Sequence, residues 1–261
     1  MELRAVALAA LLAVDTDVKC ALLAALPDEA PLDTVQCFAI PAGIPGRPLR
    51  PELIAPGKVG RRSMLTVEGR AILIHALAHI EMNAINLATD IIWRFPHLPE
   101  QFYRDWLKVA KEEARHFQLL EQHLQTLGYQ YGDFPAHNSL WEMAEKTCDD
   151  LLARLALVPR TLEARGLDVT PGVSAKLAQA GDAAGAALLM VIYHDEIGHV
   201  AIGNHWYQYL CNQQGHDTIA TYARLALHYA APTLRGPFNL AARRAAGFTE
   251  LELQALPQSS T

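Results

Sequence analysis

Two short stretches of the sequence pair a glutamate with a histidine three positions later, and both stand among apolar residues. The first pair is Glu113 and His116 in KEEARHFQ, and the second is Glu196 and His199 in YHDEIGHV. In an α-helix, residues three apart lie on one face, so each pair can offer a carboxylate oxygen and an imidazole nitrogen to the same ion. Because burying an ionised carboxylate is costly without a compensating cation, the repeated pattern predicts a metal site in a helical core.

Two further glutamates stand at matching distances from these pairs. Glu81, in HIEMNAINLA, precedes Glu113 by 32 residues, and Glu163, in LVPRTLEARG, precedes Glu196 by 33. Such a spacing suits two helical hairpins, each of which brings its two carboxylates back to the same height, as a di-metal helical bundle requires. The helix expected to carry Glu163, at about 139–165, also offers two alternative acids, Glu145 and Asp149.

The elements that must position these residues are helices. Helical periodicity runs from Val67 onward, with almost no strand-like alternation of β-branched residues, so the sequence predicts an all-α fold. We expect four long helices and a weaker fifth, at about 67–95, 99–127, 139–165, 182–212 and 217–230. Residues 1–30 predict one or two short helices, and a connector rich in proline and glycine follows.

The connections between the helices predict the topology. FPHLPE is a tight turn, so the first two long helices should be antiparallel neighbours, whereas GYQYGDFPAHN is long enough to run back along a bundle as one long crossover. We therefore expect three parts: an N-terminal helical arm with its connector at 1–62, a four-helix bundle at 63–214, and a C-terminal helix and tail at 215–261 that pack on the bundle.

Composition limits the classes of function. With 261 residues, 51% of them hydrophobic, the chain can bury a large core. A net charge of −6, and basic segments without interleaved aromatic residues (GRPLRPELIAPGKVGRR and LRGPFNLAARR), predict no nucleic-acid partner. The apolar N-terminus has Glu2 instead of a positive start and lacks a cleavage site, and we expect no membrane-spanning run. Four scattered cysteines suit reduced thiols, so we expect a cytoplasmic protein.

These residues and their order resemble the ferritin-like di-iron carboxylate superfamily. It includes ferritins, ribonucleotide reductase small subunits, bacterial multicomponent monooxygenases and a tRNA-hydroxylating monooxygenase. Within it, the stretches HIEMNAINLATDIIWRFP, EEARHF, VPRTLEARGLDVTP and YHDEIGHV are similar to the bacterial family called domain of unknown function 455. The similarity extends from about Ser63 to the C-terminal tail, and it implies a ferritin-like four-helix bundle.

The resemblance also implies roles for individual residues. Glu113 and Glu196 would bridge or chelate the metals. His116 and His199 would be terminal nitrogen ligands. Glu81 and Glu163 would be terminal carboxylates. Asp195 matches an acid that hydrogen-bonds a ligand histidine across the site in relatives, which would fix the imidazole orientation. Arg115 stands where EARH relatives often carry arginine, while Gly198 departs from that pattern in the second half.

Mixed oxygen and nitrogen ligands in an open site suit iron, with manganese next, whereas zinc favours a closed tetrahedral shell. We expect two iron ions and an oxygen-activating oxidase or hydroxylase that takes dioxygen, a small organic substrate and electrons from an external donor. A ferroxidase or iron-handling protein, a tRNA hydroxylase and a manganese catalase are alternatives. Oligomeric state is left open, and a homo-oligomer is one option.

Other conspicuous residues receive simpler interpretations. His75 and His79 are four apart and could grip zinc, but Asn83 and Asn86 share their face, so exposure or a supporting role is favoured. Tyr193 could donate a hydrogen bond or carry a radical, although core packing is favoured. Glu112 should be a surface charge, and packing is expected for the four tryptophans, Trp93, Trp106, Trp141 and Trp206.

Overall fold

The computed structural model describes residues 1–58 and 63–257, so the basic end of the connector at 59–62 lies outside the described residues. Within these ranges the regular elements are all helices, and the only β contact is an isolated bridge between Leu53 and Ala136. The predicted all-α class is confirmed. The chain forms two compact units, Met1–Trp141 and Glu142–Thr261.

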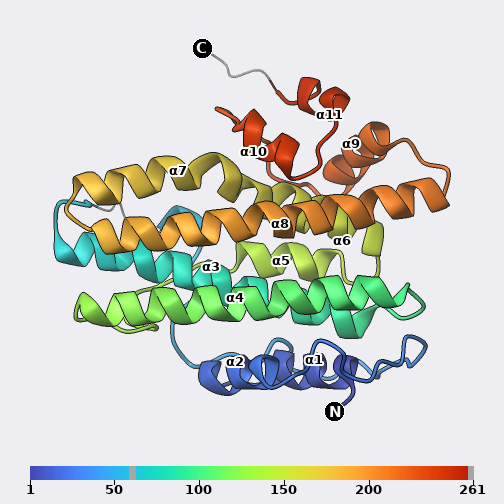
Figure 1. Cartoon of the computed structure of the whole chain (residues 1–261), viewed down its shortest axis with the longest axis horizontal. Coiled ribbons are helices and arrows are strands. Elements are labelled where there is room, and N and C mark those ends of the chain that lie inside the picture. Colours follow the sequence, from blue (N-terminus) through green and yellow to red (C-terminus); the bar gives the residue numbers. More distant parts are fainter. Residues whose placement is uncertain (59–62, 258–261) are drawn as a thin grey trace. The chain divides into compact units, whose positions relative to one another are not determined.

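The centre of the first unit is a hairpin of two long helices. Its elements are α1 (Leu3–Leu12), α2 (Thr16–Ala24), the short η1 (Pro56–Lys58), α3 (Val67–Arg94) and α4 (Glu100–Thr126). The Thr66 hydroxyl caps α3 by accepting the Gly69 N–H at 3.0 Å. The prediction of two long antiparallel helices is confirmed, and α3 and α4 lie side by side along their length (Figure 1).

The N-terminal arm is attached to the end of α3 by a buried arginine. The Arg4 guanidinium donates to the Ile92 carbonyl at 3.1 Å and to the Trp93 carbonyl at 2.7 Å. It also donates to the carbonyls of Asp33 and Gln36 in the connector. The last carbonyls of a helix lack partners within the helix, and a cation is favourable there. Arg4 therefore joins arm, connector and hairpin.

The segment after α4 runs back over α3 and covers two histidines. The Gly132 N–H donates to His75 Nε2 at 3.0 Å, and the Tyr131 hydroxyl shares a hydrogen bond of 2.8 Å with His79 Nδ1. His75 and His79 are both buried, so exposure, one of the two interpretations favoured for them, is wrong, and a supporting role stays a prediction. Their face is polar because it meets the polar groups of a returning segment and not because it meets water.

The second unit begins within α5 (Ser139–Lys146). Its other elements are α6 (Leu151–Leu157), the π-helical turn η2 (Val158–Glu163), α7 (Ala164–Gln179), α8 (Ala183–Gln213), α9 (Thr218–His228), α10 (Leu240–Ala245) and α11 (Glu250–Gln254). Helices α7 and α8 form the hairpin of this unit and turn at Gly181, where φ is +87°. The prediction of a long helix at 182–212 is confirmed.

The prediction of a single helix at 139–165 is wrong. The chain leaves α5 at Lys146, and the Asp150 side chain accepts the Ala153 N–H at 2.9 Å to start α6. Aspartate competes for backbone hydrogen bonds and so favours a cap over a helix interior. The helical path then continues through Gly166 and Pro171 as far as Gln179.

The C-terminal tail folds into helices that pack on the α7–α8 hairpin. Residues from α7, α8, α10, α11 and the link between α10 and α11 share one apolar cluster: Ala164, Leu167, Val200, Ala242, Ala246, Phe248 and Leu253. The Thr249 hydroxyl and the Glu252 carboxylate form a capping box that starts α11. The tail is thus part of the second unit's core.

One helix of the described ranges, α3, is long and apolar enough to cross a membrane, although no such run was expected. Of its most apolar window, 78% is buried within the chain. This burial favours the core helix of a folded domain over a membrane span, since a span would present its apolar side chains to lipid.

Candidate metal centre

The first unit gathers three of the predicted ligands. Glu81 on α3 is 6% exposed, and Glu113 and His116 on α4 are 0% exposed. His116 Nδ1 lies 3.3 Å from Glu81 Oε2 and 3.5 Å from Glu113 Oε2. Each of the three side chains offers one ligand atom within 4.8 Å of the others, so this buried cluster could hold a metal ion.

The distances in this cluster suit ligands that share an ion better than they suit hydrogen bonds. An ordinary N–H···O bond measures about 2.7–3.2 Å. Nitrogen and oxygen ligands at about 2.0–2.2 Å from one ion are separated by roughly 3–3.5 Å. In addition, Glu81 Oε2 is buried and has no hydrogen-bond partner of ordinary geometry among the described residues. The donors therefore fit a divalent cation.

The electrostatics of the cluster point the same way. Burial, and then repulsion from Glu113, raises the pKa of Glu81 to about 8. Burial alone would lower the pKa of His116, but its contacts with Glu113 and Glu81 outweigh that effect and raise the pKa to about 11. The Glu81 carboxyl group and the His116 imidazolium thus hold protons that a metal ion would displace on binding.

The second unit repeats the glutamate–histidine geometry. On α8, His199 Nδ1 lies 3.4 Å from Glu196 Oε1, close to the 3.5 Å of the pair on α4. His199 is buried, and the Glu196 side chain is 14% exposed. Both pairs therefore turn the same ring nitrogen toward the carboxylate three positions earlier, as their sequence spacing predicts.

Glu163 comes at the end of the π-helical turn η2 and is half-buried. A π turn widens the helix locally and re-aims the side chains that follow, and such turns are common at functional sites. Pro159 in this turn packs against α8 at Gly203, where an added Cβ would lie 2.6 Å from the Pro159 Cβ. A glycine at this position lets the turn that carries Glu163 approach α8 closely.

Comparison with known proteins agrees with these motifs. The family described as "Protein of unknown function (DUF455)" matches residues 13–254. The chain belongs to this family. A protein of Haemophilus influenzae with the description "Uncharacterized protein" is 47% identical over 234 residues, which cover 87% of this chain and 78% of that protein. No solved structure matches the chain.

The remaining predicted site residues of this DUF455 chain are Asp195, Arg115 and Tyr193. Asp195 is half-buried on α8, while Arg115 is exposed on α4. The half-buried Tyr193 packs against the apolar cluster of the second unit that includes Leu167 and Val200, and its hydroxyl accepts a hydrogen bond from Asn239 Nδ2 at 3.0 Å. The four tryptophans are buried and the four cysteines are unbridged, as expected.

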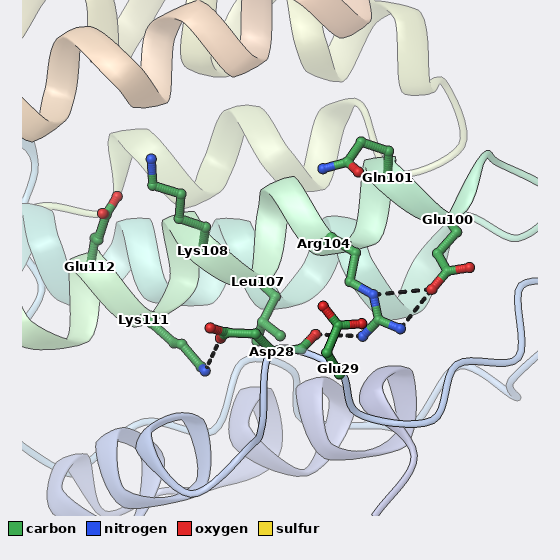
Figure 2. A pocket seen from close by; sticks show the side chains of 9 residues that line it. All are labelled: Asp28, Glu29, Glu100, Gln101, Arg104, Leu107, Lys108, Lys111 and Glu112. Carbon is green, nitrogen blue, oxygen red and sulfur yellow. Dashed lines mark hydrogen bonds and ion pairs between the residues drawn. The ribbon is translucent and has the colours of Figure 1, made fainter.

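Glu112, the neighbour of Glu113, faces a different environment. It is half-buried beside a pocket on α4 that is lined mainly by charged side chains (Figure 2). In that pocket Lys111 pairs with Asp28 and Arg104 pairs with Glu100. Glu113 thus belongs to the ligand cluster, whereas its neighbour Glu112 belongs to a charged surface. Adjacent residues of a helix point in different directions, as the helical periodicity predicts.

Arg160 is one of the buried cations that sequence reasoning missed. It donates to Asn204 Oδ1 at 2.8 Å and to Glu252 Oε1 at 2.5 Å, and its guanidinium carbon lies 4.6 Å from the centre of the Tyr207 ring. Its position three residues before Glu163, at the end of the apolar run LLARLALVPR, was an available signal. An arginine inside such a run is normally buried only when it is paired.

Proposed function

We propose that this DUF455 chain is a ferritin-like di-metal carboxylate protein, in which the ligands of both units join in one centre. The proposed ligands are Glu81, Glu113, His116, Glu163, Glu196 and His199. The observation that carries the proposal is the buried cluster of Glu81, Glu113 and His116, together with a second glutamate–histidine pair of the same geometry on α8. Four carboxylates and two imidazoles are the donor set of di-metal helical bundles.

Iron is the metal that we favour, with manganese next. Carboxylate oxygens and imidazole nitrogens suit both ions, and the donors include no thiolate that would favour zinc or copper. In this proposal Asp195 orients a ligand histidine by a hydrogen bond, as acids beside metal-bound histidines commonly do.

We propose that the reaction is the oxidation or hydroxylation of a small organic molecule by dioxygen. When bound, a pair of ferrous ions supplies two electrons to dioxygen, and an external donor restores them. The chain contributes a water-poor enclosure, since Val109, Ala110 and Phe117 are buried on the same helix as Glu113.

Metal loading tests the proposal directly. The purified protein is stripped of metal, loaded anaerobically with ferrous iron, desalted, and analysed for bound iron before and after exposure to air, with optical spectra at each step. About two irons per chain are expected, with a new absorption band after air. Fewer than about one iron per chain would contradict the di-metal proposal.

Matched variants locate the binding. Replacing Glu113 and Glu196 together by glutamine should remove most of the bound iron, whereas Glu112→Gln, which alters the neighbouring residue, should bind as the wild type does. Unchanged binding in the double variant would contradict the ligand assignment.

Particle size separates the enzyme from iron storage, because a hollow shell of many subunits would favour iron handling.

A further inference from the structure

The register of the α7–α8 hairpin places Glu163 level with His199. Pro159 of η2 packs against α8 at Gly203, where an added Cβ would lie 2.6 Å from the Pro159 Cβ. Helix α7 continues from η2 and runs antiparallel to α8, so the fourth residue after Pro159 corresponds to about the fourth residue before Gly203. This contact therefore brings the proposed ligand of η2 to the glutamate–histidine pair of α8.

The turn η2 is anchored by Arg160, which is 4% exposed. Its guanidinium donates to Asn204 Oδ1 on α8 at 2.8 Å and to Glu252 Oε1 on α11 at 2.5 Å. The rings of Tyr207 and Phe248 lie 4.6 and 4.8 Å from its central carbon. Hydrogen bonds from a guanidinium to a carboxylate are strong, and breaking a buried ion pair leaves an uncompensated charge. Arg160 is therefore held to α8 and α11 in one orientation.

The two acceptors of Arg160 are fixed in turn by the C-terminal tail. The Asn204 amide nitrogen donates to the Ala246 carbonyl at 2.6 Å, which turns the amide oxygen toward Arg160. With its other oxygen, Glu252 accepts hydrogen bonds from the N–H and the hydroxyl of Thr249 at 2.8 and 2.9 Å. Asn204 and Glu252 are both buried. The tail thus supports Arg160 through two buried side chains, and all of these residues belong to the second unit.

The direction of Glu163 depends on the geometry of the turn that precedes it. Successive residues of an α-helix are rotated by about 100°, so a turn that relaxed from π to α geometry would shift the following residues by about one position. Such a shift would point Glu163 elsewhere. Arg160 comes three positions before Glu163 in the same turn, and its anchors lie outside that turn. These anchors therefore oppose the relaxation.

We propose that Arg160 is a positioning residue for Glu163, and that it holds the π turn so that the Glu163 carboxylate is directed at the Glu196–His199 pair. The inference rests on the proposed function, because it takes Glu163 as a metal ligand. It also gives the C-terminal tail a part in metal binding, since Glu252 on α11 acts on the centre through Arg160.

The test is a double-mutant cycle on the full chain, read out as ferrous affinity in anaerobic equilibrium titrations. The four proteins are the wild type, Arg160→Met, Glu163→Gln and the double variant. We expect Arg160→Met to weaken the binding of one of the two irons about 10–100-fold, as loss of a residue that orients a ligand does. In the Glu163→Gln background the same change should have no further effect on iron affinity, because the ligand through which Arg160 acts is gone.

Two further variants separate positioning from stability. Glu252→Gln keeps a hydrogen-bond acceptor and removes only the charge, so it should fold if Arg160→Met does not, and it should weaken the same iron. Arg154, a buried arginine of α6, donates to Thr147 Oγ1 and to the Ala144 carbonyl, which lie outside η2. Arg154→Met should lower the melting temperature and bind both irons with the affinity of the wild type.

The outcomes distinguish this inference from the proposed function. If the wild type binds two irons and the folded variants of Arg160 and Glu252 bind both equally well, the positioning role is overturned and the proposed function stands. The role is also overturned if these variants weaken iron binding by the same factor with and without the Glu163 carboxylate, since that is the effect of general destabilisation. Fewer than about one iron in the wild type would contradict the proposed function and this inference together.

Discussion

At the scale of single residues, the ligand cluster of the first unit holds more protons folded than unfolded. The pKa of Glu81 is raised from 4.5 to about 8, and that of His116 from 6.5 to about 11. Between the unfolded and the folded pKa of each group, the native state binds more protons than the unfolded chain. The contribution of these groups to stability is therefore fully present at low pH and is lost as pH rises. For the metal-free protein we predict a melting temperature that falls from about pH 5 to pH 8, measured by calorimetry.

A variant of Glu81 and the pH dependence of metal affinity provide two checks on this prediction. Glu81→Gln removes the carboxyl group with the raised pKa, so the decline with pH should become shallower. Metal must displace the protons of Glu81 and His116, so the affinity for metal should rise over the same pH range. A metal-free melting temperature that rises with pH over this range would contradict the protonation of these buried groups.

At the scale of elements, the close approach of η2 to α8 depends on one glycine. A Cβ at Gly203 would lie 2.6 and 2.7 Å from Pro159 side-chain atoms, whereas one at Gly198 would have no neighbour within 4 Å. We predict that Gly203→Ala destabilises the protein by about 1–3 kcal/mol through overpacking. Gly198→Ala, on the same helix, should be neutral or stabilise by up to about 1 kcal/mol in chemical denaturation. Equal effects of the two changes would show that the contact with Pro159 is not tight.

The buried Arg4 is the second element-scale determinant, because it joins the arm to the end of α3. Replacing it by methionine leaves the carbonyls of Ile92 and Trp93 buried without their charged donor. We predict a loss of about 2–4 kcal/mol of unfolding free energy. The exposed Lys108 on α4 provides the control, since Lys108→Met should change stability by less than about 0.5 kcal/mol. A small effect at Arg4 would mean that the arm can detach without disturbing the hairpin.

Local sequence signals predicted the long helices and the grouping of Glu81, Glu113 and His116, because periodicity and spacing within a hairpin determine both. The break at Asp150 was missed although its signal, a capping aspartate, is local. The π turn was missed because it depends on packing between Pro159 and Gly203, far apart in the sequence. His75 was misjudged for the same reason, because its partner Gly132 lies 57 residues away. Non-local contacts account for the errors at η2 and at His75.

At the scale of the whole molecule, each compact unit supplies one glutamate–histidine pair, and the proposed centre needs both. A metal that binds only the folded state stabilises it by about 2.7 kcal/mol at a hundredfold excess over its dissociation constant. For a chain of this size, this corresponds to a rise in melting temperature of roughly 5–10 °C. We predict such a rise on anaerobic ferrous loading, in a single transition that includes both units.

Single-ligand variants then distinguish one shared centre from two separate ones. In a shared centre, Glu113→Gln in the first unit and Glu196→Gln in the second should each abolish most of the rise for the whole chain, since either change removes a ligand from the same pair of ions. In two separate centres, each variant would split the melting curve, with one unit still stabilised by metal and the other not. Differential scanning calorimetry of the two variants with and without iron makes the distinction, and a split curve would contradict the joining of the two halves.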